Sequence, residues 1–267
     1  LEAVYKMAVR KRKANESRPE GEKYAELQRV RLGSRLLAYL PLRVTDELVG
    51  ILREFKEKAS AIGVSQFYIQ THFQSPLEVT PEARHAIEAI LAAGWTITNQ
   101  LVYTVSASRK GHTAKLRQTL NALGVVCYYT LSVKGFRENY AVYTPNSRSL
   151  QEAREEKIFG QVPKEKQAEL YDMIRNQRPL GKRLVRFLKE NGLLFAGTDR
   201  NVLNLPAIGK SMTFHTIGLT SEGKRILKFD HDGSRRHSPI IDQMGEVYIV
   251  ENKSVAAYLR QLKEMGE

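Results

Sequence analysis

Pairs of polar residues recur at or just past the ends of four short β-prone runs in the first half of the chain. In folds built from parallel strands, the active site lies at the carboxyl ends of the strands. Any one pair could simply cap the helix that follows it, but four pairs at equivalent positions favour a shared site. These pairs are Ser34 and Arg35, Thr71 and His72, Asn99 and Gln100, and Ser132 and Lys134.

The elements that must position these pairs alternate between strand and helix patterns. The predicted strands cover residues 27–32, 67–72, 96–103 and 125–129. Thr45 and Thr80 are suitable N-caps for two of the intervening helices, with Pro81 at the first helical position of the second. Gly94 and Gly124 end two helices. Helices of about 10–13 residues between short strands are typical of βαβ units, so the sequence predicts an α/β fold with a parallel sheet.

Hydrophobic spacing predicts further helices and strands along the chain. A helical pattern covers residues 3–13, and the helix after Thr45 is expected to bury Leu48, Ile51, Leu52 and Phe55. The composition changes after residue 150, so we divide the chain into two domains, residues 1–150 and residues 151–267. The second contains a charged helical stretch, three β-prone runs and a final helix, at residues 163–191, 214–219, 225–229, 246–250 and from 254 onward.

Composition limits the classes of function that need to be considered. The formal net charge of +13 is compatible with binding to nucleic acid. The cations are interleaved with acidic residues, however, and no nucleic-acid-binding motif is present, so nucleic acid is not the favoured partner. No apolar run approaches the roughly 18 residues of a membrane span, so no membrane association is expected. The single cysteine, Cys127, excludes intrachain disulfides and favours a cytoplasmic location.

Several segments together resemble the lysine 2,3-aminomutase and glutamate 2,3-aminomutase family. Residues 30–45, VRLGSRLLAYLPLRVT, are similar to the family's third barrel strand and its loop. The motifs QTHF at 70–73, TNQ at 98–100 and YY at 128–129 follow in the family's order, and NLPAIGK at 204–210 is similar to its lysine segment. The resemblance implies a partial parallel (βα) barrel with about four strands present, followed by a helical and small α+β C-terminal segment.

The resemblance also implies cofactors, an activity and residues for each. Family members use S-adenosylmethionine, a [4Fe–4S] cluster and pyridoxal phosphate (PLP) to move an α-amino group of a small amino acid to its β-carbon. A 5′-deoxyadenosyl radical abstracts the β-hydrogen while PLP carries the nitrogen. An aldehyde cofactor requires a lysine amine, and Lys210 is the matching lysine. Ser34, Arg35, His72 and Gln100 are similar to residues on the S-adenosylmethionine side.

The chain departs from the family at the iron–sulfur cluster. The family holds its cluster with a CxxxCxxC loop, which the single Cys127 cannot supply, and the histidines show no metal-ligand spacing. No metal site is therefore expected in this chain. We interpret the sequence as a fragment that lacks the cluster-binding N-terminal part and is inactive alone. A cluster-free, catalytically degenerate homologue is the alternative, and a homo-oligomer is left open.

A second departure concerns the substrate. Lysine-specific members present two aspartates to the distal ammonium of lysine, and Lys134 and Asn204 stand at these two positions here. A cation and an amide in place of two carboxylates reverse the charge offered to the substrate, as in glutamate 2,3-aminomutases. A carboxylate beside Lys134 gains a charge-assisted hydrogen bond, whereas an ammonium is repelled. We therefore expect a glutamate-like substrate, with lysine as the alternative.

Overall fold

The computed structural model describes the chain in segments. They are residues 1–102, 104–109, 111–133, 160–175, 180–196, 201–205, 210–230, 245–251 and 253–266. Within these segments, no helix is both long enough and apolar enough to cross a membrane. Lys134 and residues 206–209 lie outside the described residues.

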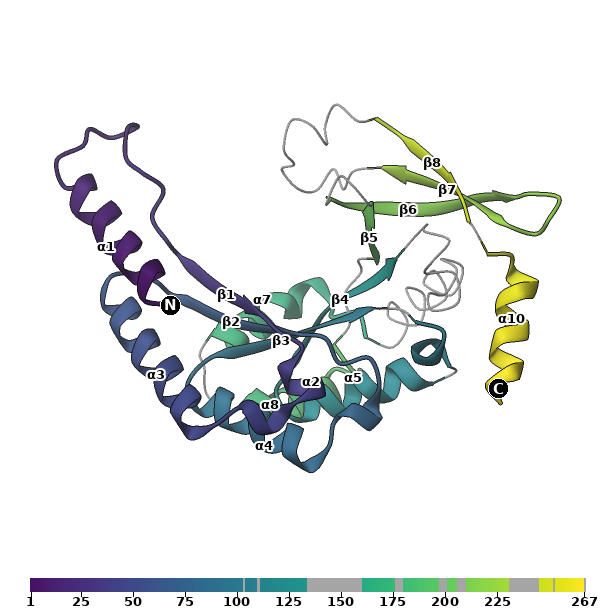
Figure 1. The fold of residues 1–267 in the computed structure, drawn as a ribbon, viewed down its shortest axis with the longest axis horizontal. Helices are drawn as coiled ribbons and strands as arrows, with labels where there is room; N and C mark the ends of the chain where they lie inside the picture. The colour runs from purple at the N-terminus through teal and green to yellow at the C-terminus, as the bar shows by residue number, and fades with distance from the viewer. Residues whose placement is uncertain are drawn as a thin grey trace.

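Five parallel strands form the main sheet, and they lie side by side in chain order (Figure 1). Their bounds are β1 Arg29–Gly33, β2 Gln66–Thr71, β3 Thr96–Val102, β4 Val126–Val133 and β5 Asn201–Leu205. The first four confirm the predicted parallel order. The sequence did not predict β5, which pairs in parallel with β4 and so brings residues from beyond position 150 into the same sheet. The α/β class is therefore confirmed, while the partial barrel stays a prediction.

Helices precede or follow these strands and cover one face of the sheet (Figure 1). Thr45 and Thr80 cap their helices as predicted, because each hydroxyl accepts a hydrogen bond from the backbone N–H three residues on, at 3.3 and 3.2 Å. Gly94 and Gly124 adopt positive φ just after their helices, which favours glycine there. The helices in this half are α1 Glu2–Asn15, α2 Leu36–Tyr39, α3 Asp46–Ala61, α4 Pro81–Ala92 and α5 His112–Ala122, with 3-10 turns at Pro41–Arg43, Pro76–Glu78 and Ser106–Ser108.

The core lies between the sheet and helices α3, α4 and α5. Trp95, which leads into β3, packs edge-on against Phe67 of β2 with ring centroids 5.4 Å apart. Its indole N–H donates to the Leu52 carbonyl of α3 at 2.9 Å, so the one polar atom of this buried ring is satisfied. This contact ties α3 to the amino ends of the strands and leaves their carboxyl ends free for other residues.

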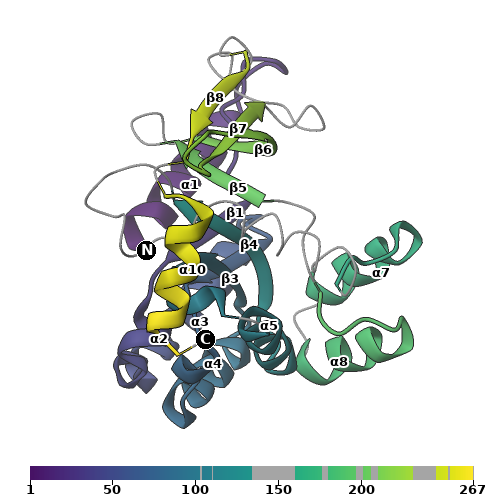
Figure 2. The ribbon, with the colours of Figure 1, turned by 90° about the vertical axis from the view of Figure 1, so that its right-hand side faces the viewer.

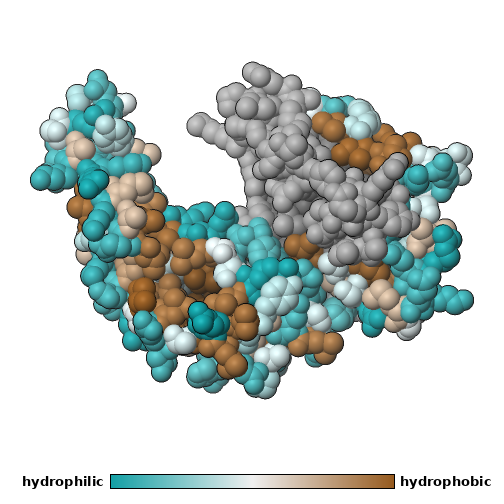
Figure 3. All heavy atoms as spheres, viewed as in Figure 1, coloured by the Kyte–Doolittle hydropathy of each residue, from teal (hydrophilic) through white to brown (hydrophobic). Residues whose placement is uncertain are grey.

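The buried face of α3 differs from the predicted stripe. Leu52 and Phe55 are buried as expected, but Val49 and Ala59 complete the face, and Ile51 is 47% exposed. Ile51 lies outside the face of α3 that packs against the sheet. Leu40 and Leu42 are exposed as well, and Figure 3 shows apolar side chains gathered on this view of the molecule.

The charged stretch 163–191 forms two helices, α7 Lys164–Arg175 and α8 Leu180–Glu190. Leu184, Phe187 and Leu188 are buried as predicted and form a second core cluster with Met173 of α7. Helix α8 lies beside α5 (Figure 2). A Cβ atom on Gly181 would come within 2.4 Å of the Ala122 carbonyl oxygen, so this close approach of α8 to α5 requires glycine.

An antiparallel extension follows the parallel strands. Its strands are β6 Lys210–Leu219, β7 Arg225–Asp230 and β8 Val247–Val250, and helix α10, Val255–Glu264, follows them. β6 begins four residues earlier than the β-prone run predicted and pairs antiparallel with β5. The extension is therefore continuous with the main sheet through β5 and β6.

Two neighbouring residues of α3 provide a test of this packing. Replacing the 2% exposed Leu52 with alanine removes buried methyl groups and leaves a cavity, so the free energy of unfolding should fall by about 2–5 kcal/mol. Ile51→Ala, at an exposed position of the same helix, should change it by about 0.5 kcal/mol or less. Urea unfolding followed by circular dichroism measures both. Equal losses would mean that α3 packs through the predicted stripe instead.

Candidate functional site

The turn after β1 brings Ser34 and Arg35 to the carboxyl edge of the sheet. The Ser34 N–H donates to the Gln70 carbonyl of β2 at 2.9 Å, which continues the parallel pairing one residue beyond β1. The Ser34 hydroxyl accepts from the Leu36 N–H at 3.1 Å, where the short helix α2 begins. Ser34 thus has a structural role in orienting the turn, and the side chain that follows it, Arg35, is the one available for a ligand.

The Arg35 guanidinium is partly buried and lies over the ring of Tyr39, with its central carbon 4.1 Å from the ring centroid. Its Nε and Nη2 atoms are buried and have no hydrogen-bond partner within the described part of the chain. A guanidinium prefers planar anions such as carboxylates, which accept two parallel hydrogen bonds. Arg35 is therefore held in place by stacking, while two of its donor atoms have no partner in the described segments.

His72 follows the last residue of β2 and is partly buried. Burial lowers the pKa of its imidazole below the ordinary value, and the nearby positive charge of Arg35 lowers it further. A hydrogen bond with the Gln100 backbone opposes these two effects. The ring is therefore biased toward its neutral form, in which one nitrogen donates and the other accepts a hydrogen bond.

Gln70 and Gln100 lie on the face of the sheet opposite to the helices. The Gln70 side-chain amide donates to the Gln100 side-chain oxygen, which links β2 to β3. The Gln70 oxygen is buried and has no partner among the described residues. The sequence prediction selected Gln100 and omitted Gln70, although Gln70 begins the QTHF motif. The period of two along β2 could have identified it, because Gln70 and His72 occupy alternate positions.

Two of the polar residues at the strand ends do not join this site. Thr71 is fully buried and Asn99 is 2% exposed, and both alternate with the site residues along their strands. Thr71 thus follows the core residues Phe67 and Ile69 onto the helix-covered face. The expectation that the four polar pairs form a shared site is therefore wrong for Thr71 and Asn99, because neighbouring residues of a strand point to opposite faces.

Of the remaining predicted residues, the structure places Asn204 and Lys210 through their backbone. Asn204 of β5 pairs with Val133 of β4 and with Ser211 of β6. Lys210, the first residue of β6, pairs with Leu205 at the carboxyl end of β5. Lys134 lies outside the described residues and directly follows Val133 in the sequence. The register therefore brings Asn204 and Lys210 to the same edge of the sheet as Gln100.

Metal ligands are lacking in the described part of the chain. No group of three or more His, Cys, Asp or Glu side chains converges there. Cys127 is buried and lies 3.7 Å from the Asn121 amide of α5, so it faces the helices.

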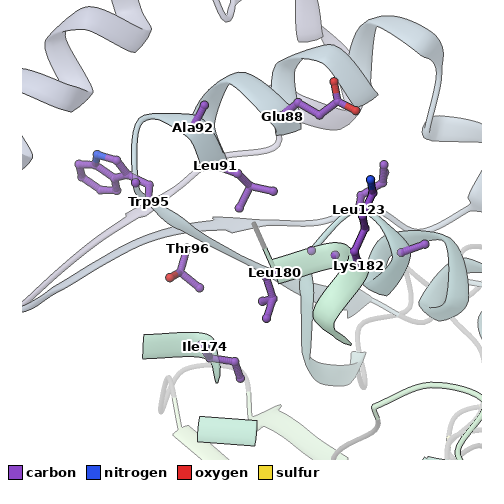
Figure 4. Close-up of a pocket in the computed structure, with 13 residues that line it drawn as sticks. Glu88, Leu91, Ala92, Trp95, Thr96, Leu123, Ile174, Leu180 and Lys182 are labelled. Atoms are coloured by element: carbon purple, nitrogen blue, oxygen red, sulfur yellow. The ribbon is translucent and has the colours of Figure 1, made fainter. Parts of the chain in front are cut away.

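A cavity of about 730 Å³ lies at the opposite end of the sheet (Figure 4). Its walls are mainly apolar, from Leu91, Leu123, Ile174 and Leu180, and it reaches Thr96 at the amino end of β3. Ligands of parallel α/β folds bind beyond the carboxyl ends of the strands. The cavity is thus separate from the cluster formed by Arg35, His72 and Gln100.

Comparison with known proteins identifies several that are similar to this chain. No protein-family model matches it. An uncharacterised KamA family protein of Methanocaldococcus jannaschii is 27% identical over 89% of the chain and 32% of that protein. A putative L-lysine 2,3-aminomutase of Aquifex aeolicus is 34% identical over 43% of the chain and 31% of that protein. A glutamate 2,3-aminomutase of Clostridioides difficile is 33% identical over 39% of the chain and 23% of that protein.

The chain thus spans no more than about a third of the length of the curated relatives it matches. Within that span, the resemblance predicted from the strand-end motifs is confirmed. The chain is a homologue of proteins named lysine 2,3-aminomutase and glutamate 2,3-aminomutase.

Proposed function

We propose that the chain supplies cofactor- and substrate-binding residues of an amino-acid 2,3-aminomutase, an isomerase that moves an α-amino group to the β-carbon. The observation that carries the proposal is the cluster of Arg35, His72, Gln70 and Gln100 at the carboxyl ends of three adjacent parallel strands. Homology to aminomutases supports the same conclusion.

S-adenosylmethionine fits the chemistry of this cluster. Its carboxylate suits the Nε and Nη2 atoms of Arg35, and the side-chain oxygen of Gln70 can accept from an ammonium or a hydroxyl, since these atoms have no hydrogen-bond partner among the described residues. A neutral His72 can take part in hydrogen bonds to the same ligand without adding a second positive charge. In this proposal Ser34 shapes the turn, while Arg35, His72 and Gln100 orient the ligand.

PLP requires a primary amine, and Lys210 is the residue that we propose to hold it. The backbone pairing of Lys210 with Leu205 supports this role, because it lies at the sheet edge that carries the other candidate residues. When bound, PLP would supply the carbonyl group that carries the migrating nitrogen. The contribution of Lys210 is to fix the cofactor at this edge.

The iron–sulfur cluster does not fit this chain. A cluster held by three thiolates cannot be built from the single Cys127, whose side chain is buried on the helix side of the sheet. We therefore assign no step to a cluster bound by these residues. The proposal for the chain is confined to S-adenosylmethionine, PLP and the amino-acid substrate.

Charge supports glutamate as the substrate. Asn204 pairs through its backbone with Val133, the residue that precedes Lys134 in the sequence. An ammonium from Lys134 would attract a side-chain carboxylate and repel a second ammonium. A pocket built from Lys134 and Asn204 therefore favours the acidic amino acid.

The PLP assignment is tested by trapping. Purified protein incubated with PLP and reduced with borohydride should carry a covalent adduct on Lys210, identified by peptide mass spectrometry. Lys210→Ala should abolish this adduct, because no other amine is proposed to lie at the cofactor aldehyde. Lys224→Ala, in the β6–β7 turn where Lys224 pairs with Glu222, is the control and should leave the adduct unchanged. An undiminished adduct on another lysine in Lys210→Ala would refute the assignment.

Substrate charge is tested by isomerisation assays with glutamate and lysine, using the full-length enzyme reconstituted with its cofactors under anaerobic reducing conditions. A charged hydrogen bond contributes about 1.5–3 kcal/mol, and about 1.4 kcal/mol corresponds to one decade, so we expect glutamate to be preferred by about tenfold or more. The double substitution Lys134→Asp with Asn204→Asp should shift the preference toward lysine. Faster turnover of lysine by the unsubstituted protein would end the glutamate proposal and leave the aminomutase proposal intact.

A further inference from the structure

The peptide unit after His72 is held by a buried asparagine of the neighbouring strand. The Phe73 N–H donates to Asn99 Oδ1 at 2.7 Å, and Asn99 Nδ2 donates to the Phe73 carbonyl at 3.1 Å. Phe73 is fully buried and Asn99 is 2% exposed. One side chain thus satisfies both backbone groups of a single residue.

These bonds explain why a polar residue occupies this buried position. The last backbone pair between β2 and β3 is Thr71 with Asn99, so the sheet ladder offers no partner to Phe73. A buried N–H or carbonyl without a partner is costly, and an apolar side chain at position 99 would leave both unpaired. Asn99 replaces the missing ladder bonds and so holds the backbone in place two residues beyond the end of β2.

Gln100, the residue next to Asn99, interacts with the same segment of the chain, residues 70–72. The Gln100 backbone forms a hydrogen bond with the His72 ring, and the Gln100 side chain accepts from Gln70. The pairing of β3 with β4 shifts register between Asn99 and Gln100. Irregularities of this kind redirect side chains next to functional sites.

We infer that Asn99 is a positioning residue for His72, which it serves by fixing the Phe73 backbone so that the imidazole stays between Arg35 and Gln100. Asn99 itself faces the core and does not line the candidate site. The inference deepens the proposed function, since His72 belongs to the proposed S-adenosylmethionine side. Its test needs no cofactor, so its failure is distinguishable from failure of the proposed function.

The His72 ring pKa is the readout, because a general loss of stability would not change it. Burial is the larger cause of its lowered pKa and Arg35 the second, while the Gln100 hydrogen bond acts in the opposite direction. Arg35 is the charged group that acts on this ring within the described residues. If the Phe73 anchor is lost, the ring becomes more solvated and moves from Arg35, so its pKa should rise.

The experiment is a nuclear magnetic resonance titration of the histidine rings, with the His72 signal assigned through His72→Gln. Asn99→Ala should raise the His72 pKa toward its ordinary value. The matched control is Asn121→Ala. Asn121 is 1% exposed and also joins two backbone groups, donating to the Val125 carbonyl at 3.0 Å and accepting from the Ala196 N–H at 2.9 Å. The Asn121→Ala substitution should destabilise the protein and leave the His72 pKa unchanged.

An unchanged His72 pKa in folded Asn99→Ala, or an equal rise in both variants, would overturn the inference. Should Asn99→Ala fail to fold, Asn99→Thr is the milder variant, because threonine suits a strand but cannot reach both Phe73 groups. Hydrogen exchange of the unsubstituted protein provides an independent check. The Phe73 amide should exchange as slowly as the ladder amides of β3, and fast exchange would show that Asn99 does not hold it.

Discussion

The parallel register between β2 and β3 is the constraint on which the candidate site depends. Thr71 lies opposite Asn99, and Gln70 lies opposite Thr98. Because side chains alternate between the faces of a strand, a shift of one residue would turn Gln70 toward the helices and bring Thr71 to the other face. Burial of Phe67 and Ile97 against the helices opposes such a shift. The same apolar contacts that stabilise the core thus determine which polar groups meet at the strand ends.

This register assigns different tasks to neighbouring residues. Asn99 is satisfied entirely by backbone groups and stabilises the path of the chain, whereas Arg35 and Gln70 retain polar atoms without partners among the described residues. A satisfied buried polar group contributes to structure, while an unsatisfied one costs free energy that a ligand can offset. The contrast indicates which of these residues are available for binding. It also explains why burial alone does not distinguish a structural polar residue from a functional one.

The strand order could be predicted from the sequence because its signals are local. Thr45, Thr80 and Gly94 mark helix boundaries through capping and positive φ, and these signals need no tertiary information. Alternation along β2 indicates that Gln70 and His72 share a face, but two adjacent polar residues give no hydrophobic contrast that would show which face is buried. The burial of Val49 in place of Ile51 likewise depends on how α3 meets the sheet. Strand β5, whose sequence NVLNL does not alternate between polar and apolar residues, shows its role only through its pairing with β4.

The candidate residues also divide along the sheet by the chemistry they offer. Arg35, His72 and Gln100 come from β1 to β3 and their turns, and they suit a ligand with an anionic group and hydrogen-bonding atoms. Asn204 and Lys210 come from β5 and β6, which lie two and three strands beyond β3 in the same sheet. In parallel sheets adjacent strands lie about 4.8 Å apart, so residues separated by two strands contact different parts of a ligand or two neighbouring ligands. Under the proposed function, the residues of β1 to β3 would therefore orient one ligand and those of β5 and β6 another.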